Sequence, residues 1–133
     1  MLFGVRIPMV AALGLVGEAI EPDYARIRMP FRDDLTNSAG RLHGGALMTV
    51  LDCVLACAAR SRDPAGTRVI TVDMTTHFIA STCGDAIAEA RCLRRGRSIA
   101  FSQGEIRDSQ GRLLATATGT FKPVPRGAPG GDG

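Results

Sequence analysis

The sequence is poor in aromatic residues, with no tryptophan, one tyrosine and five phenylalanines in 133 residues. Basic residues exceed acidic ones by only three, 16 against 13, and the densest basic cluster is Arg94-Arg95-Gly96-Arg97. Proteins that bind nucleic acid usually combine a basic face with aromatic side chains that stack on bases. We therefore expect no nucleic-acid partner, whereas a small anionic ligand is compatible with this charge.

Cysteine pairs of the CxxC type are absent, although the chain has four cysteines. Cys53 and Cys57 are four residues apart in a predicted helix, but no further Cys or His pair lies near them in the sequence, so we expect no metal site. Reduced thiols packed in a core explain the four residues better. Such thiols are typical of a cytoplasmic protein, which is the location we expect.

Long, uninterrupted apolar segments are also missing. The first 20 residues are apolar, but they lack a charged leading region, and Arg6 and Pro8 interrupt the run that a signal peptide would need. The apolar segment 46–59 is too short for a membrane span and contains Asp52. We expect neither export nor a membrane partner.

Residues 46–59 predict one long helix, because they are rich in helix-forming residues and contain no Gly or Pro. Apolar side chains on every face of this helix predict that protein surrounds it. Only Thr49 and Asp52 interrupt the pattern, and they share one side of the helix. Burying an unpaired carboxylate costs several kcal/mol, so Asp52 is a candidate functional residue.

Strand patterns lie on both sides of this helix. A short helix at 6–13 and two strand segments around a turn at 22–23 precede it, with residues 24–29 as the clearest strand. Residues 69–80, 86–93, 98–107 and 112–122 predict four strands, and turns at 94–97 and 108–111 join the last three in an antiparallel meander. In the strand 69–80, alternation places Thr71 on the polar face, opposite Ile70 and Val72. We predict one α+β domain over residues 1–122 and a disordered Pro/Gly-rich tail over 123–133.

The segment Asn37-Ser-Ala-Gly40-Arg-Leu-His43-Gly44-Gly45, with Asp52 nine residues after the histidine, resembles the signature of the hotdog-fold acyl-CoA thioesterases. It is most similar to their PaaI-like branch, named after phenylacetate degradation. Residues 69–78, 96–101 and 111–121 are similar to later strands of that family. The resemblance implies an antiparallel sheet wrapped around the long helix and hydrolysis of an acyl- or aryl-acyl-CoA thioester. It implies no cofactor, since coenzyme A is part of the substrate.

The two glycines of this motif stand where the long helix begins. Backbone N–H groups there lack helical partners and lie at the positive end of the helix dipole. A thioester carbonyl that accepts the Gly44 N–H would be polarised, and its oxyanion would be stabilised by a few kcal/mol per donor. Without side chains, Gly44 and Gly45 let the acyl group approach the backbone, so both are candidate substrate contacts.

Asp52 lies eight residues after Gly44, which corresponds to about 12 Å along a helix axis. One chain therefore cannot easily bring both groups to one carbonyl. The resemblance implies a homodimer, or a tetramer of two dimers, in which Asp52 of one subunit reaches the Gly44 site of the other. There it would act as general base on water or as a nucleophile that forms a mixed anhydride.

The resemblance also implies roles for residues around this centre. Asn37 would orient the water or the thioester sulfur, and Thr71 would supply a hydroxyl that helps to hold the water. We expect His43 to fix the turn that presents Gly44, and Met48 and Phe78 to line an apolar acyl pocket. Two interpretations of Arg94, Arg95 and Arg97 stay open: a solvated hairpin tip, or a clamp on the phosphates of coenzyme A.

Two other functions are compatible with the same fold. An acyl-thioester hydratase or dehydratase would have an aspartate followed closely by a histidine before the helix, and no aspartate stands in that relation to His43. A non-catalytic acyl-CoA-binding domain would have no use for a buried base such as Asp52. The sequence therefore favours an acyl-CoA thioesterase over both.

Overall fold

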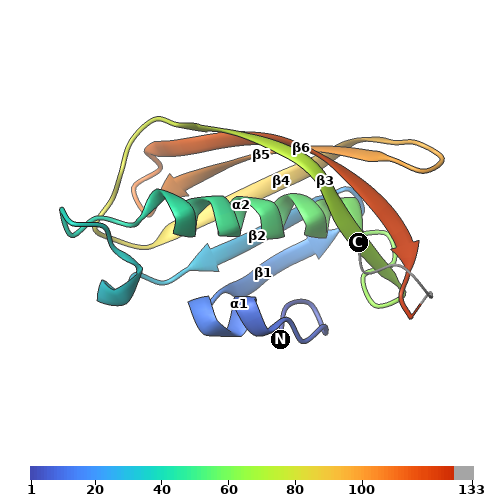
Figure 1. Ribbon diagram of the computed structural model, residues 1–133, viewed down its shortest axis with the longest axis horizontal. Helices are drawn as coiled ribbons and strands as arrows, with labels where there is room; N and C mark the ends of the chain where they lie inside the picture. Colours follow the sequence, from blue (N-terminus) through green and yellow to red (C-terminus); the bar gives the residue numbers. More distant parts are fainter. Residues whose placement is uncertain (128–133) are drawn as a thin grey trace.

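The computed structural model describes residues 1–127 as a six-stranded antiparallel sheet that curves around one long helix (Figure 1). The helices are α1 (Pro8–Leu13) and α2 (Gly44–Ala59), with a 3₁₀ turn at Asp33–Leu35. The strands are β1 (Val16–Glu21), β2 (Tyr24–Met29), β3 (Thr67–Phe78), β4 (Ala86–Arg95), β5 (Ala100–Asp108) and β6 (Leu113–Pro125). The predicted α+β class is confirmed.

The strand order is β1-β2-β4-β5-β6-β3, and every neighbouring pair is antiparallel. The predicted meander is therefore present as β4-β5-β6. Strand β3 pairs with β6 rather than with β4, so β3 forms one edge of the sheet. Strand β6 continues to Pro125, three residues beyond the predicted end of the domain, and the last part of the predicted tail, residues 128–133, lies outside the described residues.

One side of α2 packs against the inner face of the sheet. Leu47, Val50, Leu51, Val54 and Leu55 are at most 2% exposed on this side. Small residues on the sheet let the helix approach closely, and larger ones fill the remaining space: Ala86, Ala88, Ala90, Ala100, Ile27, Met29, Ile106, Leu114 and Phe121. Within residues 1–127, no helix is long and apolar enough to cross a membrane.

The opposite side of α2 is open. Met48 is exposed, and Thr49, Asp52, Cys53 and Ala56 are only partly buried. Within the described part of the chain, the prediction that protein surrounds α2 on every side is therefore wrong. We call this the open side of α2.

A β-bulge at Val72 changes the faces of β3. Thr71 pairs with Phe121 and Asp73 pairs with the adjacent Thr120, so Val72 is an extra residue without its own partner on β6. Because Phe121 points into the core, Thr71 also lies on the inner face of the sheet. The predicted strict alternation, which put Thr71 on the polar outer face, is wrong for this reason.

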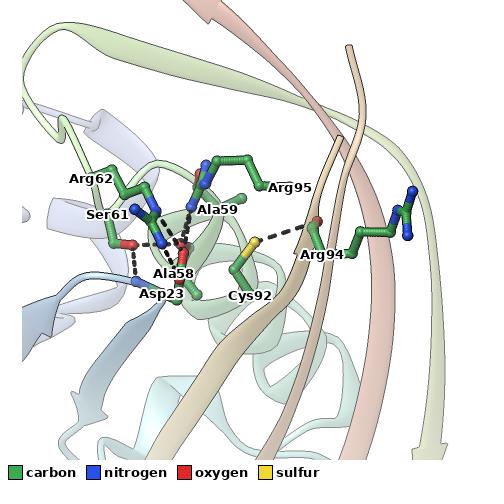
Figure 2. A network of polar contacts seen from close by, with 8 residues as sticks. All are labelled: Asp23, Ala58, Ala59, Ser61, Arg62, Cys92, Arg94 and Arg95. Atoms are coloured by element: carbon green, nitrogen blue, oxygen red, sulfur yellow. Dashed lines mark hydrogen bonds and ion pairs between the residues drawn. The ribbon is translucent and has the colours of Figure 1, made fainter. Parts of the chain in front are cut away.

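Asp23 ties the C-terminal end of α2 to the β1–β2 turn and to the end of β4 (Figure 2). Its carboxylate accepts hydrogen bonds from Arg62 at 2.7 Å and from Arg95 at 2.9 Å. Arg95 also donates to the carbonyl of Ala59, and the Asp23 N–H donates to the Ser61 hydroxyl. These bonds satisfy part of the carbonyl end of α2 and connect three segments that are distant in the sequence.

Replacing Asp23 by asparagine will lower the free energy of unfolding at pH 7 by about 1 kcal/mol, since the carboxylate is one-third exposed and solvent weakens both ion pairs. Asparagine tolerates the positive φ of 65° at this position. The bonds from Arg62 and Arg95 lower the pKa of Asp23 from 3.8 to about 2. The stabilisation is therefore present above pH 3.8 and is lost as the pH falls towards 2. Urea unfolding at pH 7 and at pH 2 checks this, because the gap between wild type and variant should close at low pH.

Candidate active site

His43 caps the start of α2. Its Nδ1 atom accepts the Gly45 N–H at 2.8 Å, and its carbonyl accepts the N–H groups of Ala46 and Leu47. A Cβ at Gly45 would lie 3.0 Å from Nδ1, so the missing side chain makes room for the cap. Since Nδ1 accepts, the neutral ring carries its proton on Nε2.

Gly44 keeps a free backbone donor at this helix start. Among the described residues its N–H has no acceptor, whereas the N–H of Gly45 is occupied by His43. Of the two predicted glycine contacts, Gly44 is thus the one able to donate to a carbonyl at the positive end of α2. The Phe78 ring lies 3.4 Å from the place where a Cβ of Gly44 would be, and it is 52% exposed. Phe78 therefore stands beside the donor, where a substrate can reach it.

Asn37 organises the loop before α2. Its Oδ1 atom accepts the N–H of Ala39 at 2.9 Å and of Arg41 at 3.2 Å. The Nδ2 amide has no acceptor among the described residues, so it is available as a donor on an exposed side chain. The N–H of His43 donates to the Leu35 carbonyl, which fixes this loop against the start of the helix.

Asp52 points from the open side of α2 towards β3. The Thr71 hydroxyl donates to its Oδ1 atom at 2.8 Å, which connects α2 to the strand that follows it in the chain. The other oxygen, Oδ2, has no partner among residues 1–127. One oxygen is therefore held in place while the other can accept a proton or attack a carbonyl carbon.

Gly44 and Asp52 do not meet within one chain. Both belong to the same straight helix, and their separation of eight residues is about 12 Å along its axis. A thioester carbonyl that accepts the Gly44 N–H is therefore out of reach of the Asp52 carboxylate of that chain.

The arginines predicted at the β4–β5 connection occupy different environments. Strand β4 extends to Arg95, so the turn begins at Gly96 and not at Arg94 as predicted. Arg95 is engaged by Asp23 and the end of α2. Arg94 and Arg97 are exposed, and Figure 2 shows Arg94 pointing away from the Asp23 network. A contact between these arginines and coenzyme A stays a prediction.

Cysteines on α2 are unsuited to nucleophilic catalysis. Burial raises the pKa of Cys53 to about 12, and burial also raises the pKa of Cys57. Thiolates are the nucleophilic form, so both thiols are inert near neutral pH. Residues 1–127 contain no group of three or more His, Cys, Asp and Glu side chains placed to hold a metal ion.

Replacing Thr71 by valine will remove the hydrogen bond to Asp52 and keep the β-branched shape that suits the strand. We expect kcat to fall about tenfold, because Asp52 loses the group that orients it, while the free energy of unfolding changes by less than about 1 kcal/mol. Thr75→Val, an exposed position on the same strand, is the control. Equal kcat values for Thr71→Val and wild type would contradict a positioning role for Thr71.

Comparison with known proteins identifies the family of this chain. The sequence model of the thioesterase superfamily matches residues 39–115, which is more than half of the chain. A protein of Halobacterium salinarum named "putative esterase" is 26% identical over 86% of this chain and 83% of its own length.

Solved structures of thioesterase family proteins have the same fold as this chain. A thioesterase family protein from Silicibacter pomeroyi has a TM-score of 0.84 and 27% identity over 90% of this chain and 91% of its own. The PaaI protein of Escherichia coli has a TM-score of 0.83, and its 21% identity, over 90% of this chain and 86% of its own, shows the fold alone. The chain therefore belongs to the thioesterase superfamily and has its hotdog fold.

Proposed function

We propose that this protein hydrolyses an acyl- or aryl-acyl-CoA thioester to the free acid and coenzyme A, at a site shared by two subunits. The observation that carries the proposal is that one helix presents two groups: a Gly44 N–H without a described acceptor and, eight residues later, an accessible Asp52 carboxylate. Membership of the thioesterase superfamily supports thioester hydrolysis as the activity. Coenzyme A enters as part of the substrate, and the free cysteines suit a cytoplasmic location.

A second copy of the chain would complete the site. Strand β3 has one edge without a strand partner in the described part of the chain, and the open side of α2 lies uncovered next to it. Two copies related by a two-fold axis can pair their β3 edges and set their α2 helices antiparallel. This arrangement would place Gly44 of one subunit beside Asp52 of the other. Two such dimers can form the tetramer that the family resemblance also allows.

The reaction then follows from the positions of these groups. The thioester carbonyl accepts the Gly44 N–H, which stabilises the negative charge on oxygen as the tetrahedral intermediate forms. Asp52 of the partner subunit removes a proton from water, the water oxygen bonds to the carbonyl carbon, and the C–S bond breaks. The thiolate of coenzyme A leaves and takes up a proton.

The alternative path uses Asp52 as a nucleophile. Its free Oδ2 atom would attack the carbonyl carbon, expel the thiolate and leave a mixed anhydride that water hydrolyses. In both paths Thr71 holds the carboxylate, and the Asn37 amide donates to the water or to the thioester sulfur. Met48 and Phe78 form apolar surroundings for the acyl group near the helix start.

Steady-state hydrolysis of short-chain, long-chain and aromatic acyl-CoAs, followed by a thiol-trapping reagent that reports free coenzyme A, tests the proposal. We expect at least one member of the panel to turn over well. A protein that binds coenzyme A but hydrolyses no thioester would instead be a ligand-binding member of the superfamily.

A further inference from the structure

A groove of about 370 Å³ begins at Asp52 and Thr71 and follows the open side of α2 towards its C-terminal end. This volume lies within the range of small-molecule sites. Most of its walls are apolar and come from the N-terminal segment, α2 and β3: Leu2, Val5, Ile7, Pro8, Cys53, Ala56 and Val69. The groove therefore suits a chain of atoms that leads away from a thioester held at Asp52.

Among the described residues, four arginines line the same groove, Arg6, Arg60, Arg68 and Arg126, and Asp52 is the one carboxylate. Arg60 is only 4% exposed. It donates to the carbonyls of Pro64 and Leu2 and to the Cys57 sulfur, but no described carboxylate pairs with it. Carbonyl oxygens carry only partial charges, so these hydrogen bonds leave the positive charge of Arg60 largely uncompensated in a nearly buried place.

Arg6 lines this groove from the N-terminal segment. Its side chain is exposed, and it makes no hydrogen bond or ion pair with any described residue. All five guanidinium N–H donors are therefore available. A guanidinium binds carboxylates and phosphates through two parallel hydrogen bonds, so Arg6 is suited to an anionic ligand.

We propose that this groove binds an anionic group of the substrate, held by Arg6 in the field of Arg60, which follows Asp52 by eight residues or about 12 Å along the helix axis. The apolar walls would enclose the chain that joins this group to the thioester. The inference rests on the proposed function, since it places the thioester at Asp52. Two parts of an acyl-CoA have the required chemistry: a carboxylate at the far end of the acyl group and the phosphates of coenzyme A.

In the proposed dimer the groove lies at the edge of the interface. Because the two α2 helices run antiparallel with Gly44 of the partner subunit beside Asp52, residues 53–60 lie beyond the start of the partner's helix. The helix of the second subunit therefore does not fill the groove, and the loop that precedes that helix would form a further wall for the substrate arm.

Three thioesters separate the two sources of the anionic group: octanoyl-CoA, its ω-carboxylated counterpart suberyl-CoA, and octanoyl-pantetheine, which has no phosphate. The variant is Arg6→Gln, and the control is Arg91→Gln, which removes the same charge from the outer face of the sheet, where Arg91 stacks on Tyr24. We expect Arg6→Gln to reduce kcat/KM about tenfold for the substrates that carry the recognised anion. Loss on suberyl-CoA alone identifies the carboxylate, and loss on both CoA esters but not on the pantetheine ester identifies the phosphates. Equal effects on all three thioesters, or none, would overturn the proposal.

A binding measurement separates this inference from the proposed function. Suberate or coenzyme A should raise the Tm of wild type and of Arg91→Gln, but not that of Arg6→Gln, whether or not any thioester is hydrolysed. If neither compound raises the Tm of wild type, the groove holds no anion site, even in an active thioesterase.

Discussion

Replacing Asp52 by asparagine will reduce the turnover of every thioester substrate by about 10³- to 10⁴-fold. The carboxamide has almost the same shape, and its oxygen can still accept the Thr71 hydroxyl at the position where Oδ1 accepts it now. It cannot take a proton from water or form an anhydride, so both proposed paths fail. Steady-state kcat measurements on the best acyl-CoA of the panel check the loss, and coenzyme A binding should be unchanged.

A matched variant shows whether the loss belongs to this carboxylate. Asp73→Asn makes the same change two residues after Thr71, on an exposed side chain of β3. Its activity should stay within about twofold of wild type, because exposed charges away from a site have small effects. An Asp52→Asn enzyme with wild-type turnover would remove Asp52 from the mechanism.

The long helix and the candidate site residues Gly44 and Asp52 could be predicted from sequence, because the patterns that indicate them lie within one short segment. Residues 46–59 carry their helix propensity themselves, and Gly44 and Asp52 stand out by residue type and spacing. The open side of α2 could not be predicted, since a side chain that would face a second subunit is as apolar as one in the core of a single chain. Sequence alone does not separate these two environments.

The positions of the Thr71 and Arg95 side chains could not be predicted from sequence, because both depend on tertiary structure. The face on which Thr71 lies is decided by a bulge, and the bulge exists because β3 pairs with β6 over a separation of about 50 residues in the sequence. Arg95 looked like part of an exposed turn, but it meets Asp23 and the end of α2, which come from two other regions of the chain. No local pattern predicts such three-way contacts.

Replacing Gly44 by proline will remove the proposed oxyanion donor and reduce kcat by about 10²- to 10³-fold. Gly44 is the first residue of α2, the helix position that accepts proline best. His43 has φ −66° and ψ 140°, the extended conformation that a residue before proline requires. The Gly44 N–H has no partner to lose among residues 1–127, so we expect α2 to form normally. Circular dichroism and kcat measured on the same preparation test both statements.

Gly44→Ala is the control for the added atoms, because it keeps the N–H and adds only a methyl group. That methyl would sit at an ordinary contact distance of 3.4 Å from the Phe78 ring. We expect a smaller loss of kcat for alanine than for proline if the N–H is the essential group. Equal losses would mean that the space beside Gly44, rather than its donor, is what the reaction requires.

Mixing the two inactive variants tests the shared site directly. In a dimer of one Asp52→Asn chain and one Gly44→Pro chain, one site contains both wild-type groups and the other contains neither. Random exchange of equal amounts makes half of the dimers mixed, so activity should return to about a quarter of wild type. If each chain instead used its own Gly44 and Asp52, every site would lack one group and mixing would restore nothing. Recovery of activity after subunit exchange would therefore show that the 12 Å between Gly44 and Asp52 is spanned by a second subunit and not by movement within one chain.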